Sequence, residues 1–246
     1  MTSLWAILAL AILHLAAGTT AALRLSWQAR VLSAAAGISV AYIFLDLLPD
    51  LAEGQRLIDG SGILPGLERH VFILALVGFT VAFWVETEAR RSRRRQRQVG
   101  SVDVTGDGTF WLGILSFVAL NASIGYIVAN PGDETVKPLW LFALVMGLHF
   151  VVNDHALTEH HGDRYRKWGR WLLVAALLVG WMVGMVPALE VPPGALALLL
   201  AYISGGVLLN VLRHELPDTD QTADVVAFAV GAGVYGALVL MLVPAA

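Results

Sequence analysis

The chain consists of long apolar runs separated by short polar segments. Eight runs are long enough for a helix that crosses a bilayer, because about 20 residues span a hydrocarbon core of about 30 Å. The predicted spans cover residues 4–23, 31–50, 69–89, 109–130, 138–158, 169–190, 194–214 and 222–243. This pattern predicts an all-α polytopic membrane protein with one transmembrane domain over residues 1–246.

Composition supports this class, since the chain is 57% hydrophobic and 14% charged, with a mean hydropathy of +0.71. It contains no cysteine, which excludes disulfide bonds and thiolate metal sites. The first apolar run has no positively charged residues before it. We therefore interpret it as a first span and not as a cleaved signal peptide.

The distribution of Lys and Arg predicts the orientation. With the N-terminus outside, only Arg56, Arg69 and Lys137 of the 16 cationic residues lie outside, which leaves 13 inside. We expect both termini on the extracytoplasmic side, in the bacterial inner (plasma) membrane. Residues 90–107 form a predicted Arg-rich cytoplasmic loop, which we expect to be mobile. Its arginines directly follow a span, so membrane anchoring explains them better than nucleic-acid binding does.

The fifth span carries polar residues where hydrocarbon is expected. His149 falls near the middle of the bilayer, and Asn153 and Asp154 follow about one turn later. Ionisable residues inside a membrane are costly to bury and are functional candidates by default. Asp154 needs a partner, because burial of an unpaired carboxylate favours its protonation. His149, His155 or a metal ion could be that partner.

Spans two and seven resemble each other. Residues 37–50 and 205–218 align at a displacement of 168 positions, which pairs Gly37 with Gly205 and aligns the two Leu-Pro-Asp endings. The two spans are an odd number of spans apart and therefore cross in opposite senses. They predict an inverted repeat in a 3+2+3 arrangement, as in transporters with a substrate site between the halves. Chance similarity of two apolar helices is the alternative.

These features together resemble the ZIP (Zrt/Irt-like) family of divalent-metal transporters. The similarity covers nearly the whole chain at the level of topology, including a polar inner loop after span three. The family's fourth-span motif, His-Asn-x-x-Glu-Gly, aligns with residues 120–125, Leu-Asn-Ala-Ser-Ile-Gly. The family's fifth-span motif, His-Glu-x-x-His-Glu, aligns with residues 149–154, His-Phe-Val-Val-Asn-Asp.

The departures from the family pattern fall on metal ligands. The family builds a two-metal site, whereas Leu120, Ile124 and Phe150 cannot coordinate a metal ion. The candidate metal ligands that remain are His149, Asn153, Asp154 and Asn121. An imidazole with carboxylate and amide oxygens, completed by water, could bind one Zn²⁺ or a harder divalent ion. The resemblance thus implies a reduced single site between helices four and five. Helix–helix hydrogen bonding is the competing explanation for Asn121.

Other polar residues are candidates for a transport path. Asp46 lies near the outer end of span two, where it could mark an entrance. His155, Glu159 and His160 crowd the inner end of span five. An exit, a metal-sensing cluster and a solvated helix end are alternative explanations for that group. His14 stands alone in the first span and is better explained as a core histidine with satisfied hydrogen bonds.

Two functions follow as hypotheses. The first is a ZIP-like carrier of a divalent metal ion, with zinc as the first candidate, that works by alternating access. The second is a non-transporting membrane protein of the same fold with a structural or regulatory role. We expect no enzymatic activity, because the chain lacks His-Glu-x-x-His, Gly-x-Ser-x-Gly and cysteine. The expected partners are the metal ion as substrate and the lipid bilayer, with no nucleic acid and no organic cofactor. A homodimer is left open.

Overall fold

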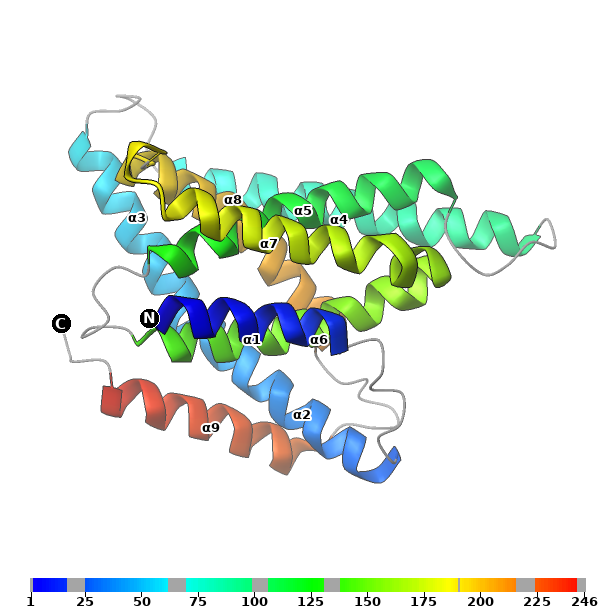
Figure 1. The fold of residues 1–246 in the computed structure, drawn as a ribbon. Coiled ribbons are helices and arrows are strands. Elements are labelled where there is room, and N and C mark those ends of the chain that lie inside the picture. Colours follow the sequence, from blue (N-terminus) through cyan, green and yellow to red (C-terminus); the bar gives the residue numbers. More distant parts are fainter. Residues whose placement is uncertain are drawn as a thin grey trace. The chain divides into compact units, whose positions relative to one another are not determined.

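The computed structural model describes residues 2–16, 25–61, 70–98, 106–130, 138–189, 191–215 and 224–242, which are helical with no β-strand among them (Figure 1). The α-helices are α1 (Thr2–Ala16), α2 (Leu25–Tyr42), α3 (Leu48–Ser61), α4 (His70–Gln98), α5 (Asp107–Ala129), α6 (Leu139–His161), α7 (Arg170–Gly184), α8 (Pro193–Asn210) and α9 (Val225–Leu242). The shorter turns are the π-helices η2 (Ile43–Leu47), η3 (Tyr165–Gly169) and η5 (Val211–Glu215) and the 3₁₀-helix η4 (Pro187–Leu189). The predicted all-α class is confirmed.

Helix length and composition indicate a membrane protein. Five helical stretches in the described chain are long and apolar enough to cross a bilayer: Ser33–Asp59, His70–Gln96, Asp107–Ala129, Pro193–Arg213 and Val225–Leu242. They correspond to predicted spans two, three, four, seven and eight. The apolar stretches Thr2–Ala16 and Leu139–Val151 are shorter. Helix α7 stops at Gly184 instead of continuing to residue 190, because Pro187 lacks the N–H that a continuing α-helix would need.

The arginine run differs from the predicted loop. Helix α4 continues to Gln98, so residues 90–98 are helical, while residues 99–105 lie outside the described chain. Arg and Glu have good helix propensity, and pairs three or four positions apart lie on one face. Arg90 Nε lies 2.5 Å from Glu86 Oε1. Arg91 Nη1 lies 2.8 Å from Glu88 Oε1.

A proline explains the irregular turn in the second long helix. Pro49 cannot donate a hydrogen bond to the carbonyl four residues earlier, and its ring crowds that carbonyl. The chain responds with η2 just before the proline, where the Leu48 N–H donates to the Ile43 carbonyl. The π-helix η5 begins at Val211, 168 positions after Ile43, and it also precedes a proline, Pro217. The local distortion therefore repeats at the displacement that aligns the two Leu-Pro-Asp sequences.

Contacts group the chain into two compact units, where the sequence predicts one transmembrane domain. Unit 1 comprises Met1–Ala21, Val81–Pro131 and Phe150–Glu190, and unit 2 comprises Ala22–Thr80, Gly132–His149 and Val191–Ala246. Helices α4 and α6 are each divided between the two units. Each unit is described separately.

Within unit 2, α2 packs closely against α9 through two glycines. A Cβ placed on Gly37 would lie 2.1 Å from the Phe228 carbonyl oxygen. One on Gly231 would lie 2.0 Å from the Ala34 carbonyl oxygen. Both distances are far below van der Waals contact, so only glycine allows the two backbones to approach this closely.

Helices α8 and α4 of the same unit make an equivalent crossing. A Cβ on Gly205 would lie 1.9 Å from the Ala75 carbonyl oxygen, and one on Gly78 would lie 1.9 Å from the Tyr202 carbonyl oxygen. The α8 residues follow their α2 counterparts Gly37 and Ala34 by 168 positions. The α4 residues precede their α9 counterparts by 153 positions. The two crossings therefore match residue by residue.

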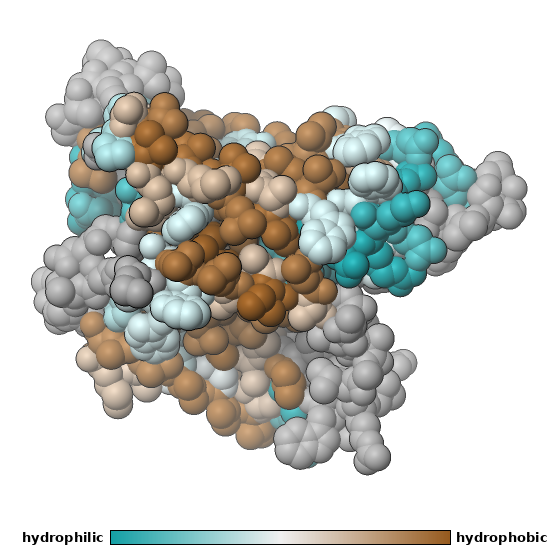
Figure 2. Space-filling view, in the orientation of Figure 1, coloured by the Kyte–Doolittle hydropathy of each residue, from teal (hydrophilic) through white to brown (hydrophobic). Residues whose placement is uncertain are grey.

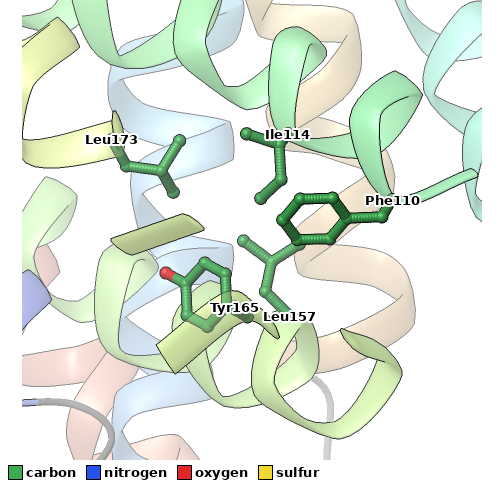
Figure 3. Close-up of a cluster of buried hydrophobic side chains, with 5 residues drawn as sticks. All are labelled: Phe110, Ile114, Leu157, Tyr165 and Leu173. Carbon is green, nitrogen blue, oxygen red and sulfur yellow. The ribbon is translucent and has the colours of Figure 1, made fainter. Parts of the chain in front are cut away.

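Unit 1 is built around α5 and α7. Glycines again allow the close crossing, since a Cβ on Gly125 or Gly180 would lie 2.0 or 1.9 Å from a carbonyl oxygen of the facing helix. Beside this crossing is a buried cluster whose side chains come from α5, α6, η3 and α7 (Figure 3): Phe110, Ile114, Leu157, Tyr165 and Leu173. This apolar cluster positions Tyr165 for the site described next.

Candidate functional site

His14 of α1 links two of the predicted metal ligands inside unit 1. Its Nδ1 lies 2.8 and 3.0 Å from the two carboxylate oxygens of Asp154 on α6. Its Nε2 lies 2.7 Å from the amide oxygen of Asn121 on α5. Three helices thus meet at one imidazole, which the sequence alone assigned to an isolated core position.

Two neighbours complete this network. The Tyr165 hydroxyl donates a hydrogen bond to the Asp154 carboxylate, and Figure 3 shows that hydroxyl directed away from Phe110. The ring of Phe150 stacks on His14, with centroids 4.0 Å apart and planes inclined by 27°. Phe150 occupies a position where the resemblance implies a metal ligand. Here it covers one face of the imidazole instead.

Hydrogen bonding indicates the charge state of His14. The Asn121 Nδ2 donates to the Phe117 carbonyl at 2.9 Å, which leaves the amide oxygen to face His14. His14 Nε2 therefore faces an acceptor and donates to it, and one further hydrogen is shared between Nδ1 and the Asp154 carboxyl group. The arrangement fits an ion-pair-like hydrogen bond between the imidazole and the carboxyl group.

Burial makes this pairing necessary. His14, Asn121 and Asp154 are 1%, 0% and 1% exposed, respectively. A buried polar group without partners costs roughly 1–3 kcal/mol, and a charged one costs more. The mutual bonds of the network offset that cost. Sequence reasoning expected His149, His155 or a metal as the partner of Asp154, and the structure supplies His14 and Tyr165.

The other predicted ligands lie elsewhere. His149 belongs to unit 2, where its Nδ1 lies 3.2 Å from the Asn210 Nδ2 of α8. Asn153 belongs to unit 1 and is 1% exposed, and its Nδ2 has no hydrogen-bond partner among the described residues. The structure thus gathers Asn121 and Asp154 around His14, and it assigns His149 to the other unit.

Unit 2 contains its own buried carboxylate, that of Asp46 on η2. Asp46 is 3% exposed and accepts a hydrogen bond of 2.5 Å from the Tyr235 hydroxyl of α9. The ring of Tyr42 meets that of Tyr235 edge-on, with centroids 6.5 Å apart. Asp50, one turn further on, is exposed. The predicted transport-path residue Asp46 is therefore enclosed, with a tyrosine as hydrogen-bond donor.

The inner end of α6 carries a second polar group in unit 1. Arg93 Nη1 donates to His160 Nδ1 at 3.1 Å, and His160 Nε2 lies 3.6 Å from Glu86 Oε1. His155 and Glu159 belong to α6, but their side chains lie outside the described residues. Arg93 occupies one ring nitrogen of His160, which lowers the capacity of this residue to bind a metal ion.

His161 is the next residue and is buried against the ring of Phe110. Burial is the main cause that lowers the pKa of His161 from 6.5 to about 3, with smaller contributions from the neighbouring His160 and Arg164. The imidazole is therefore neutral at physiological pH. This neutral ring packs against an aromatic side chain, whereas His14 shares a hydrogen with a buried carboxyl group.

Neither the described side chains nor the sequence match a known type of metal site or a known family. No group of three or more His, Asp or Glu side chains with the geometry of a metal site occurs in the described part of the chain. No protein-family model matches the sequence, and a comparison with curated proteins gives no significant match. The local geometry therefore carries the functional argument.

Proposed function

We propose that this chain is a membrane-embedded carrier of a divalent metal ion, with zinc as the first candidate, that works in the manner of the ZIP family. In this proposal eight helices span the bilayer in a 3+2+3 inverted repeat, and one half moves against the other to give alternating access. Both termini lie outside the cytoplasm of a bacterial cell, and the chain is not an enzyme.

The observation that carries the proposal is the convergence of His14, Asn121 and Asp154. An imidazole, an amide oxygen and a carboxylate are donors that Zn²⁺ and harder divalent ions accept. Two ligands of a tetrahedral Zn²⁺ at 2.0–2.1 Å stand about 3.3 Å apart. The 2.8 Å separation of His14 Nδ1 and Asp154 Oδ2 is close enough that a small movement would admit a metal ion in place of the shared hydrogen.

This donor set revises the proposed site. The imidazole that the family pattern has on the fourth span, where this chain has Leu120, comes instead from His14 on α1. Asn153 remains a proposed ligand, because its side chain is buried in the same unit. His149 remains a proposed member of the path and is tested separately. The matched crossings of α2 with α9 and of α8 with α4 support the repeat on which alternating access depends.

Reconstituted transport tests the proposal directly. The purified full-length chain is placed in liposomes that contain a fluorescent zinc indicator, and zinc is added outside. We expect uptake by the wild type, loss of at least tenfold in rate for Asp154→Asn and His14→Gln, and little change for Ser123→Ala. Ser123 is a matched control because it is buried on α5 and bonds only to the Ala119 carbonyl of its own helix.

The results distinguish an error about transport from an error about the position of the metal site. If the wild type neither binds nor passes Zn²⁺, Mn²⁺, Fe²⁺ or Co²⁺ in either direction, the carrier proposal is wrong. If uptake occurs but survives Asp154→Asn and His14→Gln, the site is elsewhere. Loss of uptake in His149→Gln would add His149 to the path.

A second candidate function rests on a specific observation in the same network. Hydrogen bonds join four side chains without a metal ion: those of His14, Asn121, Asp154 and Tyr165. A protein of this fold that no longer transports metal, with a structural or regulatory role in the membrane, would use the network to hold α1, α5 and α6 together. Loss of stability in His14→Gln, with no metal binding by the wild type, would favour this candidate.

A further inference from the structure

The junction of η3 and α7 collects exposed tryptophans and cations. Trp168 and Trp171 are 59% and 53% exposed. Lys167 is exposed beside them, and the Arg170 guanidinium carbon lies 5.6 Å from the centre of the Trp171 ring. Residues three and four positions apart lie on one side of a helix, so these four side chains form one surface. We call it the interfacial patch.

Two of its cations have no anionic partner among the described residues. Neither Lys167 nor Arg170 forms an ion pair there, and the buried Arg170 Nε has no hydrogen-bond acceptor. By contrast, Arg164 pairs with Asp107 at 2.5 Å, and Arg166 pairs with Asp163. A buried donor without an acceptor costs free energy. An anionic group from outside the chain would instead pair with the exposed Lys167 and with the accessible part of the half-buried Arg170 side chain.

The position of the patch indicates which anion. Hydrophilic surface covers the end of α4 and the turn from α6 into α7, and hydrophobic surface follows along α7 (Figure 2). Tryptophan side chains favour the level of the lipid headgroups. A guanidinium and an ammonium at that level match a phosphate diester, which Arg binds through paired donors.

We propose that the interfacial patch binds the headgroup of an anionic phospholipid, with Lys167 and Arg170 on the phosphate and Trp168 and Trp171 against the glycerol and upper acyl chains. The proposal requires membrane insertion of the chain and does not depend on metal transport. It differs from general attraction of the arginine run on α4, because Arg94 and Arg95 are exposed there without adjacent tryptophans.

Lipid titration of the full-length protein in detergent tests the site. Phosphatidylglycerol or phosphatidylcholine is added, bound lipid is counted by native mass spectrometry, and the midpoint of thermal unfolding is recorded. We expect phosphatidylglycerol to bind and stabilise more than phosphatidylcholine. Each cation near a membrane surface contributes about fivefold in affinity, so Lys167→Gln with Arg170→Gln should weaken binding on the order of 30-fold.

The matched control removes two charges elsewhere in unit 1. Arg94→Gln with Arg95→Gln should weaken phosphatidylglycerol binding much less than Lys167→Gln with Arg170→Gln does, because no tryptophans adjoin Arg94 and Arg95 to hold the lipid. An equal loss in both double variants would overturn the proposal in favour of general charge attraction. Equal effects of the two lipids would overturn it as well.

Two further measurements distinguish a lipid site from a site for a soluble phosphate and cover the case of a double variant that does not fold. Glycerol 3-phosphate supplies the phosphate without acyl chains, and stabilisation equal to that by phosphatidylglycerol would assign the patch to a soluble phosphate instead. If the double variant does not fold, Lys167→Gln alone is used, because its side chain is exposed. An unchanged affinity of that variant would contradict the assignment.

Discussion

Two buried carboxylates, Asp154 in unit 1 and Asp46 in unit 2, have similar burial but different partners. Asp154 is 1% exposed and accepts hydrogen bonds from His14 and Tyr165. Asp46 is 3% exposed, and the Tyr235 hydroxyl donates to it. The first carboxyl group shares a hydrogen with an imidazole that can carry a positive charge. The second has a neutral phenol as its donor.

This difference has a consequence for function. When a divalent metal ion binds between His14 and Asp154, the hydrogen that they share is released, so the net charge of the site rises by only one. The described contact of Asp46 brings a phenol hydroxyl and no imidazole to the carboxylate. The comparison favours Asp154 over Asp46 as the centre of the proposed metal site, and Asp46 remains a residue of the proposed path.

The largest expected effect comes from removing the cation beside Asp154. His14→Leu leaves a buried carboxylate with one neutral donor, and loss of one partner of a buried ion pair costs about 3–5 kcal/mol. Denaturant unfolding of the purified protein measures the change. The double variant with Asp154→Leu should recover much of the loss, because no charge is then left buried. A double variant as unstable as the single one would contradict the ion pair.

The pH dependence of stability should reveal the other histidine of unit 1. His161 is neutral in the folded chain, with a pKa of about 3, whereas the unfolded residue titrates near 6.5. Above about pH 6.5 the histidine is neutral in both states and does not reduce stability. As pH falls from 6.5 toward 3, only the unfolded state binds the proton, so the free energy of unfolding decreases. The folded state should lose about 2 kcal/mol between pH 7 and pH 5.

The variant His161→Phe should flatten that slope in unfolding measurements across this range. The groups around His161 that act on its charge are His160, Arg164, Arg93 and Glu86. The carboxylate of Glu86 opposes the lowering of the pKa, whereas His160 and the guanidinium groups of Arg164 and Arg93 reinforce it. A slope that is unchanged in the variant would assign the pH dependence to another residue.

A smaller effect is expected at Asp46. Tyr235→Phe removes the hydroxyl that donates to the carboxylate and should cost about 1–2 kcal/mol. Thermal or denaturant unfolding should therefore show a clearly smaller loss than His14→Leu gives. Equal losses at the two sites would remove the distinction between an ionic and a neutral partner.

The smallest effect is expected at an exposed ion pair, which sets the scale for the others. Arg91 and Glu88 are paired at 2.8 Å on the surface of α4, with side chains 63% and 31% exposed. Arg91→Gln should change the free energy of unfolding by no more than about 0.5 kcal/mol. A loss above 2 kcal/mol would show that the helical extension of α4 contributes more to stability than its exposure indicates.

The apolar pattern predicted the helices well, because long apolar runs leave few alternatives to helix in a bilayer. It placed the beginning of α4 correctly but ended that helix too early. The arginines after residue 89 were taken as a loop from their charge, whereas their helix propensity and the pairs with Glu86 and Glu88 continue the helix. The reading of α7 to residue 190 failed because Pro187 ends the helix sooner.

The candidate site was predicted only in part. Asn121 and Asp154 were singled out because polar groups in apolar spans need partners, and both lie in one network. His14 was set aside because nothing nearby in the sequence explains it. The partner is 140 positions away, so no local spacing rule could find it. If every ionisable residue in a predicted span had been treated as a site candidate until a partner was found for it, His14 would have remained a candidate.

By itself the sequence determined the class of the protein, since the number and length of apolar runs follow from the solvent that surrounds them. It also indicated the similarity of spans two and seven, which pairs Gly37 with Gly205, and each of these glycines lies at a close helix crossing in the structure. Only the tertiary structure decided which polar side chains meet. A helix fixes the direction of each side chain, but the helix that faces it is set by packing across the whole chain, and that packing joined His14 to Asp154.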